Sequence, residues 1–289
     1  MSKTALIVGA GSGISASFAR VLAKDGYRVA LVARNPAKLT GLAAETKAAT
    51  YSCDVADPAS VDQLFAQIDR EFPKLDVCLF NASARAQGPI TDVDREQART
   101  ALLILAYGGF LVAQAAARRM LPRGAGTILL TGASASVKGY PQSAVFAMGK
   151  FALRGLAQSM ARELAPKGIH VAHFVIDGGV RNAEKGRVES ENMAADSYLD
   201  PEAIAQSYLH VVKQARSAWT WEVELRPGLS GSEVAAPACL PTVEGAVYGS
   251  PRQESETGPR ALFGLWGGDV AKMLGLWQHW DCLCGRPKR

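Results

Sequence analysis

The sequence predicts a doubly wound α/β domain, in which a parallel sheet carries helices on both faces. Short apolar segments recur along residues 1–228 and alternate with stretches whose apolar residues have helical spacing. The apolar segments are continuous rather than alternating, which is typical of parallel strands buried on both faces. A turn rich in glycine follows the first of them. These observations predict one domain over residues 1–228 and a C-terminal extension over residues 229–289.

The beginning of the domain is expected to contain strands at residues 4–8, 28–33, 49–55 and 76–80, with helices between them that begin near residues 14, 36 and 58. In the first helix, Ile14, Phe18 and Leu22 share one apolar face, and Gly26 ends it. Asp57 precedes a proline, and this pair predicts the cap and the first position of the third helix.

The alternation of strands and helices continues to residue 225. Helices are expected over roughly residues 93–121 and 143–165, and another begins after Asp200 and a second proline. The strands that accompany them are expected at residues 126–132, 170–176 and 221–225.

The extension over residues 229–289 has a different composition. Turn residues fill its first half without any period, whereas its end is rich in Trp and Leu. The apolar side chains of residues 269–279 fall on one face of an expected helix. We expect the extension to pack on the domain or on a partner subunit. Contact with a membrane surface is an alternative, and the composition also allows an unnatural reading-frame product.

Charge and cysteine usage argue against several classes of function. A net charge of +5 without internal basic runs argues against nucleic-acid binding. No stretch is expected to reach the roughly 18 apolar residues of a membrane span, and no signal peptide is recognised. Cys53 and Cys78 lie in or beside strands and are expected to be buried thiols. Cys282 and Cys284 form an isolated C-x-C motif. A zinc site would need two more ligands at suitable spacing, so no metal site is expected. A reducing, cytoplasmic location fits these features.

The glycine-rich turn carries the strongest functional signal. Gly9, Gly11 and Gly13 lie between the first strand and the first helix, in the stretch VGAGSGIS. Such glycines permit a tight turn and let the backbone approach a pyrophosphate, and the N–H groups of the helix start around Ser12 and Ile14 face the anion. The position of this turn in a βαβ unit predicts a Rossmann-type dinucleotide site.

The spacing Gly9-x-x-x-Gly13-Ile14 resembles the Gly-x-x-x-Gly-x-Gly loop of the short-chain dehydrogenase/reductase family. The resemblance covers nearly all of residues 4–225 and implies an oxidoreductase that binds a nicotinamide dinucleotide. Ser15 replaces the third glycine of the family, and its hydroxymethyl group is expected to point away from the cofactor.

The end of the second strand predicts the cofactor preference. An acidic residue there would accept hydrogen bonds from the adenosine ribose of NAD(H), but the chain has Ala33 and Arg34, with Lys38 one turn later. A guanidinium suits a 2′-phosphate, because it stays charged and binds bidentately. We therefore expect NADP(H) rather than NAD(H). A solvated surface arginine is the alternative for Arg34.

The resemblance implies further cofactor contacts at the carboxyl ends of the third, fourth and sixth strands. These contacts are Asp54, Val55, Asn81, Ala82, Ser83 and the backbone of Val180. Ser83 stands where the family has a glycine, while Asp177 and Asn182 stand for a proline and a threonine.

The catalytic positions depart from the family pattern. In the family, a tyrosine supplies the proton, a lysine four residues later tunes it and grips the ribose, and a serine and an asparagine assist. Phe146 stands in the tyrosine position, and Lys150 is retained. The serine position falls on Ala133, and the asparagine position falls on Leu105. The missing acid is worth about 10²- to 10⁴-fold in rate.

Two polar neighbours are candidate substitutes. Tyr140 lies in the loop KGYPQS and is a candidate surrogate acid, although a loop position is poorly pre-organised. Ser134, next to Ala133, is a candidate oxyanion donor. Lys150 is expected to bind the ribose without the phenol, and a surface lysine is the alternative.

Two functional hypotheses follow. The first is an NADP(H)-dependent reductase of a small carbonyl or conjugated C=C substrate, with an unusual proton source and with residues 180–200 selecting the substrate. The second is a nucleotide-binding protein that has lost turnover and acts as a sensor or as a partner in an oligomer. Segments 99–121 and 143–165 resemble the family's interface helices, so a homodimer or homotetramer is expected.

Overall fold

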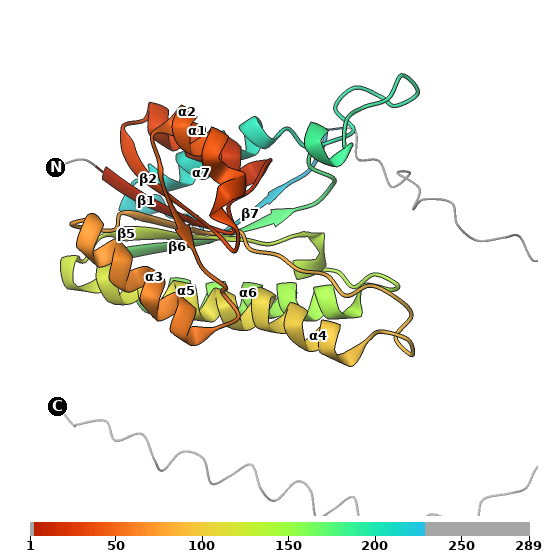
Figure 1. Cartoon of the computed structure of the whole chain (residues 1–289), viewed down its shortest axis with the longest axis horizontal. Helices are drawn as coiled ribbons and strands as arrows, with labels where there is room; N and C mark the ends of the chain where they lie inside the picture. Colours follow the sequence, from red (N-terminus) through yellow and green to blue (C-terminus); the bar gives the residue numbers. More distant parts are fainter. Residues whose placement is uncertain (1–2, 229–289) are drawn as a thin grey trace, which may run out of the picture. The chain divides into compact units, whose positions relative to one another are not determined.

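The computed structural model describes residues 3–228, which form a seven-stranded parallel sheet covered by helices on both faces (Figure 1). The strand order is β3-β2-β1-β4-β5-β6-β7. The predicted fold class is therefore confirmed. The extension over residues 229–289, with the expected helix at 269–279 and the pair Cys282 and Cys284, lies outside the described residues.

Each strand and helix expected within residues 3–228 is present, with small shifts at the ends. The strands are β1 Lys3–Val8, β2 Tyr27–Ala33, β3 Ala49–Ser52, β4 Val77–Phe80, β5 Gly126–Thr131, β6 Ile169–Ile176 and β7 Glu222–Leu225. The helices are α1 Ile14–Lys24, α2 Thr40–Thr46, α3 Pro58–Glu71, α4 Arg95–Leu102, α5 Gly108–Met120, α6 Ala144–Leu164 and α7 Pro201–Val212. A short 3-10 turn, Pro36–Leu39, precedes α2.

The sheet separates two hydrophobic cores, as the alternation of side chains along β1 illustrates. Leu6 and Val8 join the core beneath α3, α5 and α6, whereas Ala5 and Ile7 join the core beneath α1 and α7 (Figure 1). Successive side chains of a strand point to opposite faces, so a strand buried on both sides must be apolar throughout. The continuous apolar runs of the sequence have this physical cause.

Helix starts follow the capping signals of the sequence. The Asp57 side chain accepts a hydrogen bond from the Ala59 N–H at 3.0 Å, and Pro58 begins α3. The Asp200 side chain accepts one from the Glu202 N–H at 2.8 Å, and Pro201 begins α7. Both predicted caps are confirmed.

The helix expected over residues 93–121 is interrupted by a π-helical turn, Leu103–Tyr107, between α4 and α5. The turn lets the start of α5 approach its neighbours closely. A Cβ at Gly108 would lie 2.8 Å from the Val55 backbone oxygen, and one at Gly109 would lie 2.5 Å from a Leu153 methyl carbon. Such turns occur often at functional sites. The sequence pattern did not predict this one.

The helical run Arg95–Arg123 is long and apolar enough to cross a membrane by length and composition, with a mean hydropathy of 1.7 in its most apolar window. Length and composition of one such helix are weak evidence for a membrane span. Half of that window is buried within the domain, as in a core helix.

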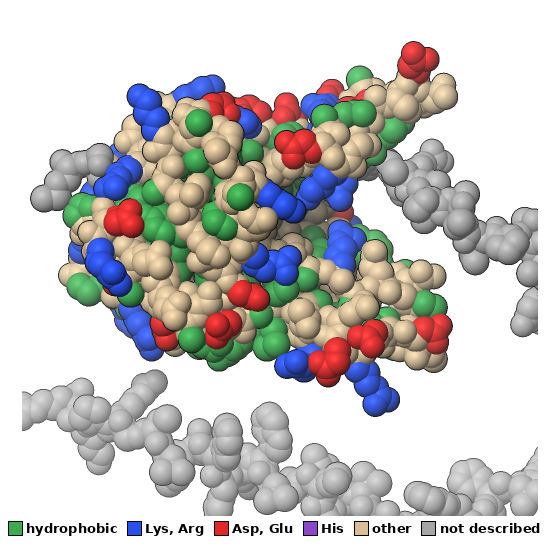
Figure 2. Space-filling view, viewed as in Figure 1, with side chains coloured by type: hydrophobic (Ala, Val, Ile, Leu, Met, Phe, Trp, Pro, Cys, Tyr) green, Lys and Arg blue, Asp and Glu red, His purple; other side chains and the backbone are tan. Residues whose placement is uncertain are grey.

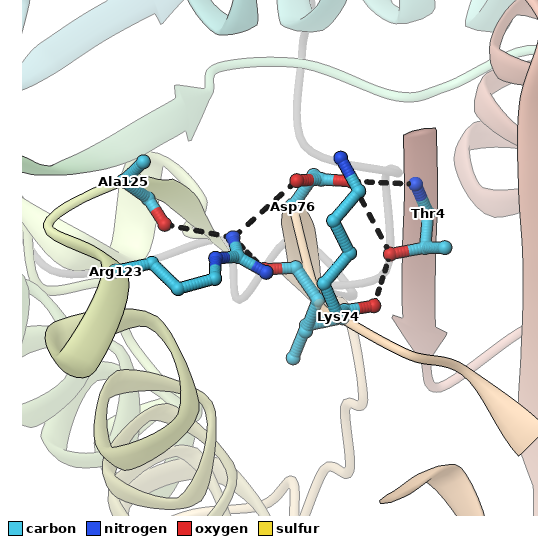
Figure 3. Close-up of polar contacts among 6 residues, drawn as sticks. Thr4, Lys74, Asp76, Arg123 and Ala125 are labelled. Carbon is cyan, nitrogen blue, oxygen red and sulfur yellow. Dashed lines mark hydrogen bonds and ion pairs between the residues drawn. The ribbon is translucent and has the colours of Figure 1, made fainter. Parts of the chain in front are cut away.

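A polar cluster joins strands at the edge of the sheet opposite the glycine-rich turn (Figure 3). The Asp76 carboxylate, just before β4, accepts a hydrogen bond from the Thr4 N–H of β1 at 2.8 Å. Lys74 and Arg123 form ion pairs with the same carboxylate at 3.2 and 3.3 Å. Arg123 also donates to the Ala125 carbonyl at 2.9 Å, before β5. This cluster is structural, since it lies at the amino ends of the strands.

Candidate active site

A cleft of about 1120 Å³ opens at the carboxyl ends of the strands (Figure 2 shows basic side chains around the hollow). It lies where β1 and β4 are neighbours, the point at which the strand order reverses and at which open α/β sheets bind ligands. Most positions that the sequence singled out line it. They are Gly9, Gly11, Ser12, Gly13, Ile14, Arg34, Asp54, Val55, Asn81, Ala82, Ser83, Phe146, Lys150 and Val180.

The glycine-rich turn requires glycine at its two ends. Gly9 has φ +85°, and a Cβ there would lie 2.2 Å from the backbone nitrogen of Ala82, at the end of β4. Gly13 has φ +102° and caps α1. Both conformations favour glycine strongly. At Gly11, by contrast, a Cβ would meet nothing within 4 Å. The turn therefore packs against β4 at one end and faces open space in its middle.

Ser15 connects the glycine-rich turn to β4 through hydrogen bonds. Its buried hydroxyl lies 3.1 Å from the Gly9 carbonyl oxygen, to which it donates, and it accepts a hydrogen bond from the Asn81 amide at 2.7 Å. The serine that replaces the expected glycine thus joins the turn to the end of β4. The Asn81 side chain is held by that contact.

Asn182, in the loop after β6, also binds the glycine-rich turn. Its amide donates to the Ser12 carbonyl at 3.0 Å and lies 3.2 Å from the Ser12 hydroxyl. Its side-chain oxygen accepts from the Lys185 N–H at 3.2 Å. From the sequence, Asn182 was expected only to replace a threonine of the family. The stretch IDGGVRN at the end of β6, which ends in Asn182, was the sequence feature that could have identified it as a site residue.

Two cations lie at the end of the cleft next to β2, called here the β2 end. Arg34 and Lys38 both line the cleft, and neither forms an ion pair within residues 3–228. Asn35 between them caps the 3-10 turn by accepting from the Ala37 N–H at 3.1 Å. Asp54 and Val55 form the neighbouring wall. The β2 end is therefore a basic surface beside an apolar and acidic rim.

The opposite end, called the β5 end, is apolar where polar side chains were expected. Leu105 and Phe146, 0% and 7% exposed, form one cluster with Ala135 and the partly buried Ala133. Gly149 makes room for this arrangement, since a Cβ there would lie 2.6 Å from the Leu105 Cβ. The three replaced positions are therefore neighbours that fill one space together.

Lys150 is the member of the expected catalytic set that remains polar at the β5 end. Its side chain is 3% exposed, and its ammonium donates to the Thr131 carbonyl at 2.7 Å. Nζ lies 5.8 Å from the centre of the Phe146 ring. Burial and the nearby charge of Arg85 lower the pKa of Lys150 to about 7. Burial disfavours the charged form, and a single carbonyl compensates it only in part.

Comparison with known proteins places this geometry in a family. The model for short chain dehydrogenases matches residues 3–190. The chain belongs to the short-chain dehydrogenase family. It is 31% identical to D-threitol dehydrogenase from Mycolicibacterium smegmatis over 174 residues. This alignment covers 58% of this chain and 67% of the relative. It is 30% identical over 223 residues to diacetyl reductase from Staphylococcus epidermidis, which covers 75% of this chain and 86% of the relative.

Solved structures agree with this assignment. A short-chain dehydrogenase from Rhodopseudomonas palustris is 36% identical and has a TM-score of 0.67, with 78% of this chain and 98% of that chain covered. Structures with the same fold include complexes with NADP and with NAD⁺. The fold of the short-chain dehydrogenases is therefore present here.

The two substitutes considered from the sequence do not line the cleft of this short-chain dehydrogenase. Ser134 begins a 3-10 turn, Ser134–Ser136, and its carbonyl accepts from the N–H groups of Val137 and Lys138. Tyr140 is 43% exposed in the following loop. Neither residue is among those that line the cleft, although Ala135 of the same turn packs against Phe146.

A buried hydrogen-bond chain, absent from the sequence-based expectations, holds the Ala133 turn. Ser136 Oγ accepts from the Ala133 N–H at 3.1 Å and lies 3.3 Å from His173 Nε2. His173 Nδ1 lies 3.0 Å from Glu222, and Arg154 binds the same carboxylate bidentately at 2.6 and 2.7 Å. Burial lowers the pKa of His173 to about 4 despite this carboxylate. A neutral imidazole therefore accepts from Ser136 and donates to Glu222, which leaves no free hydroxyl there.

Proposed function

We propose that this short-chain dehydrogenase binds NADP(H) and transfers hydride to a small carbonyl or conjugated C=C substrate, with Lys150 as the proton source. The observation that carries the proposal is the position of Lys150. It is the titratable group of the expected catalytic set that both lines the cleft and carries a proton. Bound NADPH would supply the hydride, and the protein supplies orientation and the proton.

Lys150 has the environment of a tuned general acid. A pKa near 7 keeps about half of its ammonium groups protonated at neutral pH, where both donation and recovery of the proton are favourable. As hydride adds to the electrophilic carbon, the proton passes from Nζ to the carbonyl oxygen, or to the α-carbon of a conjugated C=C bond. The neutral amine then regains a proton from water. The Thr131 carbonyl holds Nζ in place at 2.7 Å.

Turnover assays test this proposal directly. We expect the wild-type chain to oxidise NADPH in the presence of small ketones or enones, with enones preferred because their reduction depends less on a strong acid. Absence of turnover with every carbonyl and enone, in a chain that binds NADPH, would contradict it. The Phe146→Tyr variant serves as the internal comparison, because it restores the family's phenol above Lys150.

A second function, nucleotide binding without turnover, is favoured by one observation. Leu105, Ala133 and Phe146 form a contiguous apolar cluster, so the polar machinery is replaced as a unit. Under this hypothesis the protein is a sensor or a partner in an oligomer. Activity that appears only in Phe146→Tyr would support it, whereas robust turnover by the wild-type chain would exclude it.

Replacing Arg34 is expected to change the cofactor preference. Arg34→Asp removes the guanidinium at the β2 end and places a carboxylate where a 2′-phosphate would bind. A charge-assisted hydrogen bond contributes about 1.5–3 kcal/mol, so NADPH affinity should fall roughly 10- to 100-fold while NADH affinity is kept or gained. Calorimetric titration with both nucleotides measures the change. The control is Arg70→Asp on α3, and equal effects of the two variants would refute the assignment of Arg34.

We also propose that the chain forms an oligomer through helices α5 and α6. A cytoplasmic location is proposed as well. Tyr107 and Phe110 near the start of α5 stack with ring centres 6.2 Å apart and are 41% and 40% exposed. On α6, Met148 and Phe151 are 57% and 44% exposed. Large apolar side chains gathered on two helices favour an interface. We propose a homodimer or homotetramer formed through this surface.

A charge in this surface is expected to dissociate the oligomer. Phe151→Glu would bury a carboxylate in the proposed interface, and light scattering after size exclusion should then give the mass of one chain. Ile90, 76% exposed and outside both helices, provides the control Ile90→Glu, which should keep the assembly. An unchanged mass for Phe151→Glu would contradict the interface.

A further inference from the structure

Two arginines that line the cleft, Arg85 and Arg187, have no role in the function proposed so far. The guanidinium carbon of Arg85 lies 4.3 Å from the centre of the Phe146 ring. Arg187 lines the same cleft, and its charge contributes, after burial, to lowering the pKa of Arg85. The two cations are thus close enough to repel each other. An anion bound between the two cations would remove this repulsion.

Neither arginine has an anionic partner within residues 3–228. The acids that line the cleft there are Asp54 and Glu184, and neither forms an ion pair with Arg85 or Arg187. The neighbouring Arg181, in contrast, binds Glu189 bidentately at 2.9 and 2.6 Å. The protein therefore neutralises one guanidinium of this loop and leaves another open to the cleft.

The backbone that carries Arg187 is fixed relative to the glycine-rich turn. Asn182 and Arg187 exchange backbone hydrogen bonds at 2.7 and 2.9 Å, and Asn182 is bound to Ser12. Arg85 is held differently, because its guanidinium lies over the Phe146 ring, a contact that favours a cation. Arg85 therefore lies close enough to Lys150 to lower its pKa, and Arg187 lines the same cleft, so the two guanidinium groups can bind a planar anion there.

A bound NADP(H) does not account for both charges. The glycine-rich turn suits the pyrophosphate, and Arg34 and Lys38 lie at the β2 end for a 2′-phosphate. Arg85 contacts Phe146 at the β5 end instead. We propose that Arg85 and Arg187 bind a carboxylate of the substrate, so that the protein reduces a small oxo acid or enoic acid. This proposal rests on the function proposed above and names the substrate class of the same site.

The paired substrates acetoacetate and methyl acetoacetate, and crotonate and methyl crotonate, test the proposal in the presence of NADPH. NADPH oxidation is measured for the wild type, for Arg85→Gln and Arg187→Gln, and for the control Arg70→Gln. We expect the wild type and the control to prefer the acids at least about 10-fold in kcat/KM, as hydrogen bonds to a charged group imply. Arg85→Gln should lose this preference and keep its affinity for NADPH.

Calorimetric binding makes each outcome decisive. The affinity of the NADP⁺ complex for acetoacetate and for its methyl ester is measured in the same variants, so a chain without turnover still gives an answer. Equal treatment of acid and ester by a wild type that binds NADPH overturns the carboxylate site and leaves the proposed function standing. A preference for acids that survives in both Arg85→Gln and Arg187→Gln also overturns it. Failure of the wild type to bind NADPH overturns the proposed function and this inference with it.

Discussion

Replacement of Lys150 by methionine is expected to abolish measurable reduction. The change removes the proposed proton donor, a loss worth about 10²- to 10⁴-fold in rate, and also removes the cation proposed to bind the nicotinamide ribose. Methionine has similar length and suits a site that is 3% exposed, so the variant is expected to remain folded. NADPH oxidation under saturating substrate measures the effect.

The pH dependence of the wild type gives an independent check. The pKa of Lys150 is lowered to about 7 by burial, and donation requires the protonated form. The rate of reduction should therefore fall as pH rises through about 7, and the reverse oxidation should rise over the same range. Lys167→Met, at a surface lysine beyond α6, is the control and should keep wild-type activity. A Lys150→Met chain as active as this control would exclude lysine as the acid.

Replacement of Gly9 by valine is expected to remove nucleotide binding and lower the stability of the fold. A β-branched residue at φ +85° is strained by about 1–3 kcal/mol, and its Cβ would lie 2.2 Å from the Ala82 nitrogen. The turn would have to move away from β4. Thermal unfolding and NADPH titration of the same preparation measure the two losses.

Gly11 separates binding from folding. A Cβ at Gly11 meets nothing within 4 Å, so Gly11→Val should unfold at nearly the wild-type temperature. It should nevertheless bind NADPH weakly, because the new side chain occupies the space expected for the pyrophosphate. The control for both measurements is Gly155→Ala on α6, where a Cβ would also meet nothing within 4 Å. Wild-type NADPH affinity in Gly11→Val would show that the nucleotide does not approach this turn.

The fold was predictable because its signals are local. Continuous apolar strands, the proline starts at Asp57 and Asp200, and the glycines around Gly9 each act within a few residues. Leu105, Ala133 and Phe146 were also predictable as replaced positions, from the resemblance to the family. Their packing in a single apolar cluster depends on the tertiary structure, and the spacing of these residues along the chain does not indicate it.

The features that escaped prediction depend on contacts between distant segments. Ser15 was expected only to avoid the cofactor, yet its partner Asn81 lies 66 residues away. The bond from Ser136 to His173 joins β6 to the turn after β5, and Arg85 reaches Phe146 from the loop after β4. Composition and periodicity carry no information about such pairs, because they describe neighbours along the chain.

The central claim is that the glycine-rich turn binds the phosphates of a reduced nicotinamide dinucleotide. Calorimetric titration of the full chain with NADPH and, separately, with NADH tests it most directly. The account predicts saturable binding of one molecule per chain, with micromolar affinity for NADPH and weaker affinity for NADH. Absence of saturable binding of either nucleotide up to millimolar concentration would contradict it.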